Sequence, residues 1–248
     1  MNRFDGVKVL LTGAGSGIGR ATAIRLAAEG ADLFAVDRAA AGLAETGSLI
    51  EGSGRYVPHV ADVTEEAAVV TAVDAAAAGL GGIDVLVNVA GIQRTTPIES
   101  LTVADLNLLF SVNLVGTALF CREALRHLPD RTGVIVNVAS IAATQGNPYM
   151  TAYAASKGAV LAFSLSLAAE VVGRGIRVVP ISPGTVATPL TRDIEFPEGA
   201  DLRYFGRIRS LLGSAAPEQI AAAIAFAASS DGGYLTGANL RVDGGSGT

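Results

Sequence analysis

A tyrosine and a lysine stand four residues apart in the stretch Tyr153–Lys157, just before an apolar run that carries no charge until Glu170. Because an α-helix turns once in about 3.6 residues, the two side chains would leave the same face of a helix and address one site. A nearby ammonium would lower the pKa of the tyrosine from about 10 toward the working range of a general acid or base. The alternative is structural: a surface lysine whose apolar stem packs along a buried tyrosine, with its amine in solvent, shows the same spacing.

A glycine-rich turn, Thr12–Gly19, follows the short apolar run Val7–Leu11 and precedes the helical stretch Arg20–Glu29. Glycines let a backbone approach a pyrophosphate closely, and the free N–H groups at a helix start bind the anion. The alternative is a tight turn with no ligand, and the glycine spacing departs from G-x-G-x-x-G. The cofactor contacts expected in this turn are Gly13, Ser16, Gly17, Ile18 and Gly19.

The next apolar run ends in Asp37, which is followed by Arg38. A carboxylate at this position accepts hydrogen bonds from the ribose of an adenosine and repels a 2′-phosphate, which favours NAD over NADP. Arg38 would instead pair with a 2′-phosphate, but Ser16 offers no second basic group in the turn. Asp62, after the third apolar run, would meet the adenine edge or only begin a turn.

Apolar runs alternate with helical stretches along the whole chain, an order that predicts an α/β fold. Nearly continuous apolar runs such as Ile83–Val87 are typical of strands buried on both faces of a parallel sheet. We therefore predict a Rossmann-like, doubly wound parallel sheet of seven strands with helices on both faces. The expected strands are 7–11, 31–36, 56–60, 83–87, 134–138, 176–181 and 239–243.

Small and polar residues follow the central strands, where open α/β sheets bind their ligands. Asn88–Gly91 comes after the fourth expected strand, Ser140 after the fifth, and the rigid loop Ser182–Thr188 after the sixth. Ser140 is not a hydrolase nucleophile, because the chain contains no G-x-S-x-G sequence. These segments are candidates for contact with a cofactor or a substrate.

Two helix starts carry capping signals. Thr64, followed by two glutamates, predicts an N-cap, and Thr102 with Asp105 resembles a capping box that opens a long helix to Leu128. Within that helix Asn113 falls on the apolar face. A buried asparagine usually satisfies a local hydrogen bond, so this position is open between a structural and a functional role.

Length and composition limit the classes of protein. The 248 residues are half hydrophobic and include no polar linker, which indicates a single domain over 1–248 with a candidate substrate lid at 189–213. One cysteine and two distant histidines exclude a disulfide framework and a transition-metal site. A net charge of −5 with scattered arginines argues against nucleic acid. No signal peptide or membrane span is expected, so we predict a cytoplasmic protein.

Taken together, these motifs resemble the short-chain dehydrogenase/reductase family over essentially the whole chain. One departure is Asn88-Val-Ala-Gly, where the family usually has Asn-Asn-Ala-Gly. The matching residues are Thr12, Gly13, Gly17, Ile18, Gly19, Asp62, Val63, Asn88, Ala90, Gly91, Asn113, Ser140, Tyr153, Lys157, Pro183, Gly184, Thr188 and Val242–Gly245.

The resemblance implies hydride transfer between a nicotinamide and a carbonyl carbon, with Tyr153 as the general acid or base. Lys157 would hold down the tyrosine pKa and bind the nicotinamide ribose, Ser140 would donate to the substrate oxygen, and Asn113 would position a water from a π-bulge or kink. The implied cofactor-binding residues are the turn residues above, with Asp37, Asp62, Val63, Asn88, Ala90, Gly91, Tyr153, Lys157, Pro183, Gly184, Val186 and Thr188.

The leading functional hypothesis is an NAD(H)-dependent secondary alcohol dehydrogenase or ketone reductase for a small to medium, mainly apolar substrate. The alternatives are an NADPH-dependent 3-oxoacyl-thioester reductase and a non-catalytic protein that senses a cofactor. The resemblance also implies a homotetramer built partly on the helices around Asn113 and Tyr153. The expected pocket residues are Gln93, Ile141, Ala142, Gln145, Tyr149 and the segment Thr191–Gly213.

Overall fold

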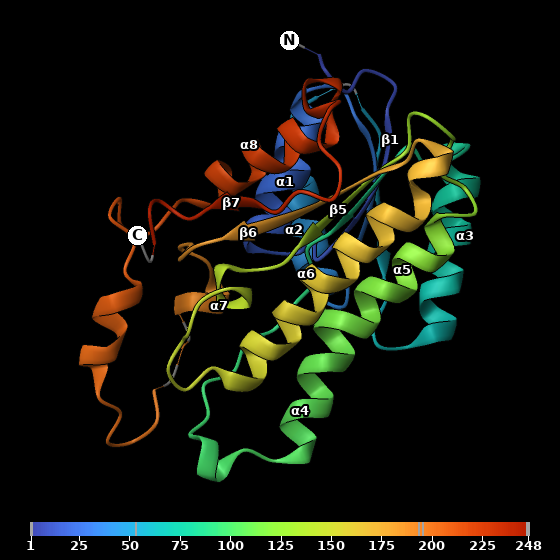
Figure 1. Ribbon diagram of the computed structural model, residues 1–248. Helices are drawn as coiled ribbons and strands as arrows, with labels where there is room; N and C mark the ends of the chain where they lie inside the picture. Colours follow the sequence, from blue (N-terminus) through green and yellow to red (C-terminus); the bar gives the residue numbers. More distant parts are fainter. Residues whose placement is uncertain (1, 53, 193, 195, 247–248) are drawn as a thin grey trace.

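The structure is a computed structural model that describes residues 2–52, 54–192, 194 and 196–246. Seven parallel strands form one sheet, as the sequence predicted, and their order is β3-β2-β1-β4-β5-β6-β7 (Figure 1). Most strand ends lie within one or two residues of the expected positions. The strands are β1 Lys8–Thr12, β2 Asp32–Asp37, β3 Tyr56–Val60, β4 Val85–Asn88, β5 Val134–Val138, β6 Arg177–Pro183 and β7 Leu240–Val242.

Helices cover both faces of this sheet, because successive strand residues point to opposite sides. In β1, Val9 and Leu11 belong to a core cluster with three helices, whereas Leu10 packs among three others. The first group consists of α1 Gly17–Ala28, α2 Ala40–Ser48 and α8 Pro217–Ala228; the second consists of α3 Glu66–Leu80, α5 Gly116–Ala124 and α6 Thr151–Val171 (Figure 1).

The order of the strands reverses between β1 and β4. The chain passes from β1 through β2 to β3 at one edge of the sheet and then crosses back to β4, which pairs with the other side of β1. This arrangement leaves the carboxyl ends of β1 and β4 side by side without a connection crossing over them. Open α/β sheets bind ligands at such a switch point.

Helix α6 buries one continuous face. The buried positions recur every three or four residues, which is the spacing of a single helical stripe. Tyr153 and Lys157 belong to this stripe and are only 7% and 5% exposed. The prediction that the two residues share one helix face is therefore confirmed. The buried residues of α6 are Ala152, Tyr153, Ser156, Lys157, Val160, Leu161, Ser164, Leu167, Ala168 and Val171.

Some local expectations hold and others fail. Thr102 and Asp105 form the predicted capping box of α4, Val103–Phe110, which continues through a π-helical turn, Ser111–Val115, into α5. Thr64 is not an N-cap, because Glu65 takes that position and the Thr64 hydroxyl donates instead to Asp62.

The segment expected to be irregular after residue 188 is partly helical. It contains the short helix α7, Pro189–Arg192, and a 3-10 stretch, Leu202–Ile208. The segment therefore has local order of its own above the carboxyl end of the sheet.

Two helical stretches, Val103–Ala124 and Thr151–Arg174, are long and apolar enough to cross a membrane by length and composition alone. The sequence analysis did not foresee this. It is weak evidence for a membrane, because a core helix of a soluble protein passes the same test. Their most apolar windows are 28% and 39% buried, so both stretches also keep apolar surface exposed.

Candidate active site and cofactor cleft

The glycine turn between β1 and α1 lies tightly against the end of β4. Gly13 has a φ of +72°, and a Cβ built on it would come within 2.7 Å of the Ala90 nitrogen. Only glycine fits this combination of positive φ and close backbone contact. Helix α1 begins at Gly17, and the side chain of its N-cap, Ser16, makes no capping hydrogen bond. The first N–H groups of α1 are therefore left for an anion.

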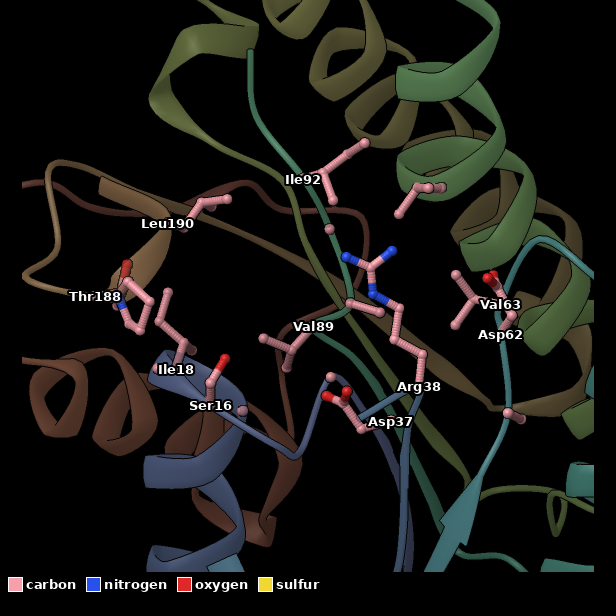
Figure 2. A pocket seen from close by; sticks show the side chains of 18 residues that line it. Ser16, Ile18, Asp37, Arg38, Asp62, Val63, Val89, Ile92, Thr188 and Leu190 are labelled. Atoms are coloured by element: carbon pink, nitrogen blue, oxygen red, sulfur yellow. The ribbon is translucent and has the colours of Figure 1, made fainter. Parts of the chain in front are cut away.

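A first cavity opens over this turn and collects most of the expected cofactor contacts. Figure 2 shows Thr188 and Leu190 on one side of it and Asp62 and Val63 on the other, with Arg38 reaching in between. The predicted residues that line it are Gly13, Ser16, Gly17, Ile18, Gly19, Asp37, Asp62, Val63, Ala90, Gly91 and Thr188.

Asp37 holds the glycine turn in place as well as lining the cavity. Its Oδ2 accepts a hydrogen bond of 2.9 Å from the Gly15 N–H, and its Oδ1 accepts one of 2.9 Å from the Ala39 N–H. The side chain of Arg38 extends from the same strand end toward Ile92 (Figure 2). A carboxylate and a guanidinium therefore share the end of the cavity at which adenosine ribose contacts were expected.

Asp62 serves as a turn former. Its Oδ1 accepts hydrogen bonds from the Thr64 N–H at 2.9 Å and from the Thr64 hydroxyl at 2.8 Å. These bonds to the charged form lower the pKa of the Asp62 carboxyl. The carboxylate thus stays ionised while it lines the cavity.

A second cavity of about 360 Å³ adjoins the first. The two have five lining residues in common: Ile18, Val89, Gly91, Thr188 and Leu190. Ser140, Tyr153 and Lys157 line the second cavity, together with the expected cofactor contacts Pro183, Gly184 and Val186. A long ligand lying in the first cavity can therefore reach the tyrosine and lysine in the second.

Ser140, Tyr153 and Lys157 come from two adjacent elements. Ser140 follows β5 and hydrogen-bonds the Tyr153 hydroxyl, and its Oγ also accepts from the Ala142 N–H at 3.1 Å. Lys157 Nζ donates to the carbonyl oxygen of Val138 at 2.8 Å. Helix α6 and the end of β5 thus converge on one point of the cavity wall.

The electrostatics differ from the expectation that Lys157 lowers the pKa of Tyr153. Burial raises the pKa of Tyr153, and the hydrogen bond with Ser140 is what acts to lower it. Burial also lowers the pKa of Lys157 to about 8. The expected direction is thus wrong for the tyrosine in this structure, because removal from water penalises both charged forms.

Asn113 lies in the predicted π-helical turn but lines neither cavity. Its Oδ1 accepts from the Ile92 N–H at 2.8 Å, and its Nδ2 donates to the Ile92 carbonyl at 3.0 Å and to Ser156 Oγ at 2.9 Å. The Asn113 carbonyl, expected to be free for a water, accepts from the Thr117 hydroxyl at 2.8 Å. The side chain joins the loop after β4 to α6.

Asn88 also lies away from both cavities. It is buried, and its Nδ2 donates to Asn137 Oδ1 at 2.9 Å and to Cys121 Sγ at 3.4 Å. Asn137 Nδ2 continues the network to Ser164 Oγ at 2.9 Å. The structure therefore places the Asn88 side chain in an interior network between strands and helices, outside the lining of both cavities.

The second cavity has an outer wall that the sequence analysis identified only in part. Gln93, Ile141 and Gln145 line it as expected, whereas Ala142 and Tyr149 do not. The Tyr149 hydroxyl instead accepts from the Asp201 N–H at 3.1 Å, which ties the loop before α6 to the lid segment. Residues that the sequence analysis missed include Asn147 and Met150. Asn147 and Met150 lie between Ser140 and Tyr153 in the sequence, and this position could have indicated that they line the same cavity.

The fold and the cavities define a class first: an α/β protein with a dinucleotide-type glycine turn and a tyrosine–lysine pair at the carboxyl edge of the sheet. A family model described as "Enoyl-(Acyl carrier protein) reductase" matches residues 13–247. The chain belongs to the short-chain dehydrogenase/reductase family and is an NAD(P)-dependent oxidoreductase acting on CH–OH groups.

Curated relatives and solved structures extend over nearly the whole chain. It is 42% identical to D-threitol dehydrogenase of Mycolicibacterium smegmatis, covering 98% of this chain and 94% of that one. It is 37% identical to 3-oxoacyl-(acyl-carrier-protein) reductase FabG of Thermotoga maritima, covering 98% of both. A short chain dehydrogenase from Burkholderia cenocepacia, solved in complex with NADP, superposes with a TM-score of 0.86 at 34% identity, covering 98% of this chain and 99% of that one.

Proposed function

We propose that this enzyme interconverts a secondary alcohol and a ketone with NAD(H), using Tyr153 as the general acid or base. The observation that carries the proposal is the meeting of Ser140, Tyr153 and Lys157 in a cavity that adjoins the glycine-turn cavity. The relative named D-threitol dehydrogenase supports an alcohol as the substrate.

The residues present fit a nicotinamide dinucleotide. The uncapped start of α1 would hold the pyrophosphate, and Asp37 would face the adenosine ribose. Lys157 and Tyr153 would lie at the nicotinamide end, where the two cavities adjoin. When bound, the cofactor supplies the group that accepts or donates the hydride.

The protein's own side chains manage the proton and the substrate oxygen. In reduction the carbonyl carbon gains a hydride while Tyr153 gives its phenolic proton to the oxygen; in oxidation both transfers run in reverse. Ser140 donates a hydrogen bond to the same oxygen and holds it beside Tyr153. Lys157 lines the same cavity and would bind the ribose at the nicotinamide end, which would keep the reacting ring beside Tyr153.

The choice between NAD and NADP depends on Asp37 and Arg38. The carboxylate of Asp37 favours NAD because it would repel a 2′-phosphate, and Ser16 supplies no basic group in the turn. Arg38 reaches into the same cavity, and the Burkholderia cenocepacia relative was solved with NADP (Figure 2). We propose NAD as the preferred cofactor, with NADP used less well because Arg38 offsets part of the repulsion.

A second candidate function is reduction of a 3-oxoacyl thioester with NADPH. Its support is the relative named 3-oxoacyl-(acyl-carrier-protein) reductase, together with Arg209, an exposed cation in the wall of the second cavity. Rates measured with the two cofactors at equal concentration separate this candidate from an NAD(H)-dependent alcohol dehydrogenase.

The proposal is tested with native enzyme and the variant Tyr153→Phe on a panel of secondary alcohols and ketones with both cofactors. We expect turnover by the native enzyme and a loss of kcat by two or more orders of magnitude in Tyr153→Phe, because the proton donor is gone. Cofactor binding, followed by the change in NADH fluorescence, should persist. An active Phe variant would end the assignment of Tyr153.

We also propose that the protein is a cytoplasmic homotetramer. Its support is apolar surface left exposed on the two longest helical stretches, including Val115, Leu165 and Val172. Exposed apolar side chains grouped on packed helices are typical of interfaces between subunits. A tetramer would cover the surface that gives these stretches their membrane-like hydropathy.

A further inference from the structure

Gln93 in the substrate cavity has a hydrogen-bond donor that nothing satisfies. The residue follows β4 by a few positions and lines the second cavity with Ser140 and Tyr153. Its Nε2 is buried and has no hydrogen-bond partner within the part of the chain that the structure describes. Buried polar groups are nearly always paired, so an unpaired one at a cavity wall calls for an explanation.

The other carboxamides of this wall already have partners. Gln145 Nε2 donates to Asn147 Oδ1 at 3.3 Å, and Asn147 Nδ2 lies 3.9 Å from Met150 Sδ. Gln93 therefore differs from its neighbours in having a free donor. The final torsion of a glutamine side chain is broad and roughly two-fold, so the Nε2 can turn toward the cavity at little cost.

The cavity itself offers no carboxylate to this donor. Among the described residues that line it, the charged side chains are Lys157 and Arg209, both cations. An acceptor for Gln93 must then come from whatever fills the cavity. The oxygen on the reacting carbon is assigned to Ser140 and Tyr153, so the acceptor for Gln93 is a different oxygen.

We propose that Gln93 is a specificity-determining residue that binds a second oxygen of the substrate. The inference rests on the proposed function and narrows its substrate class to compounds with two oxygens. These are diols in the direction of oxidation, and hydroxyketones or diketones in the direction of reduction. A site that leaves a buried polar group unpaired discriminates strongly against an analogue that lacks the matching oxygen.

The test compares 2,3-butanediol with 2-butanol, which share a carbon chain and differ by one hydroxyl. The measured quantity is the ratio of kcat/KM for the diol to kcat/KM for the mono-alcohol. We expect a ratio of at least about tenfold for the native enzyme and a fall to near unity for Gln93→Met, which keeps the length of the side chain but lacks the amide.

Gln145→Met is the matched control, because it removes an amide of the same wall whose donor is already bonded. Its ratio should stay within about threefold of the native value, since it takes away no free donor. An equal fall in both variants would overturn the assignment to Gln93. If Gln93→Met does not fold, Gln93→Leu removes the amide in a shorter apolar side chain, and it should show the same loss of preference.

The outcomes for this inference and for the proposed function are distinct. No turnover of either alcohol or of the panel with either cofactor would remove the proposed function and the inference with it. Turnover of both alcohols with an unchanged ratio in Gln93→Met would overturn the inference alone. A retained diol preference in Gln93→Leu would do the same, because leucine has no hydrogen-bonding group in its side chain.

Discussion

Burial shifts the pKa values of Tyr153 and Lys157 toward their neutral forms, although the lysine is still mainly an ammonium at neutral pH. The pKa of the phenol is raised and that of the ammonium is lowered to about 8. A neutral phenol is the form that gives a proton to a carbonyl, so the tyrosine is ready for reduction at neutral pH. Oxidation needs the phenolate, which becomes available only as the pH rises.

The first prediction concerns this asymmetry. Because the pKa of Tyr153 is raised, initial-rate kcat/KM for ketone reduction should be nearly flat between about pH 6 and 8. The same quantity for alcohol oxidation should rise about tenfold per pH unit over that range, in proportion to the phenolate. Parallel profiles in buffers of constant ionic strength check this. An oxidation rate independent of pH would contradict it.

A second prediction follows from Lys157. Between pH 8 and 10.5 the unfolded chain keeps the lysine proton that the folded chain has lost, so folding stability rises with pH through that window. We therefore compare the free energy of unfolding of the native protein with that of Lys157→Met. As the pH rises from 8 to 10.5, the difference should change in favour of the native protein by up to about 3 kcal/mol. Below pH 8 the difference should be constant. Urea titrations at pH 7, 8.5 and 10 measure it.

A difference that does not change with pH across this window would show that the lysine is not desolvated in the folded protein. Tyr153 titrates in both proteins, so its contribution cancels in the comparison. The sign itself is informative, because a lysine stabilised by an acidic partner would give the opposite trend.

At the scale of elements, the site depends on how closely three segments approach one another. The loop after β4, the π-helical turn Ser111–Val115 and helix α6 are joined by the side chain of Asn113, which bonds Ile92 and Ser156. Gly91 lies at the centre of this junction. A Cβ built there would come within 3.1 Å of Asn113 Oδ1 and 3.3 Å of Lys157 Nζ.

The third prediction is that Gly91→Ala lowers kcat by about tenfold to a hundredfold, because the added methyl pushes Lys157 away from its position. Binding of adenosine monophosphate in the first cavity should be nearly unchanged. Gly79→Ala in α3 is the control, since a Cβ there meets nothing within 4 Å. It should leave kcat intact and raise the unfolding temperature slightly. Equal kcat in both variants would exclude this role of Gly91.

The elements show what could be predicted from the sequence and what could not. Strands such as β5 and the capping box at Thr102 follow from local patterns, and both were predicted. Thr64 was misassigned because its hydroxyl has a closer partner, Asp62, than the helix start. The pKa of Tyr153 could not be predicted, because it depends on how deeply other segments bury the tyrosine. The interior position of the Asn88 side chain could not be predicted either, because a sequence does not show which side of a strand end faces the helices.

At the scale of the whole molecule, the apolar surface of α6 and its neighbours remains uncovered in one chain. Leu165 is 40% exposed and Val172 is 60% exposed. Leu161 and Leu167 on the same helix are buried in the core. The helix thus has one apolar face that packs on the sheet and a second, smaller apolar face that a second copy of this chain would cover.

The fourth prediction is that Leu165→Glu lowers the molecular mass in light scattering to that of a smaller assembly, because a charge is costly in an apolar interface. The circular dichroism spectrum should stay native. Leu49→Glu, on the α2 side of the sheet and 48% exposed, is the control and should leave the mass unchanged. A single-chain mass for the native protein would refute the proposed tetramer.

The two adjoining cavities are built by different means. The glycine turn of the first is held by contacts to its main chain, such as Ala90 against Gly13 and the Asp37 carboxylate against the Gly15 N–H. Much of the outer wall of the second consists of side chains on segments such as the loop before α6 and α7. Main-chain contacts tolerate few substitutions, whereas exposed side chains exchange freely. Evolution can therefore alter what this enzyme recognises while its chemistry stays fixed, and relatives of similar identity carry the names of different substrates.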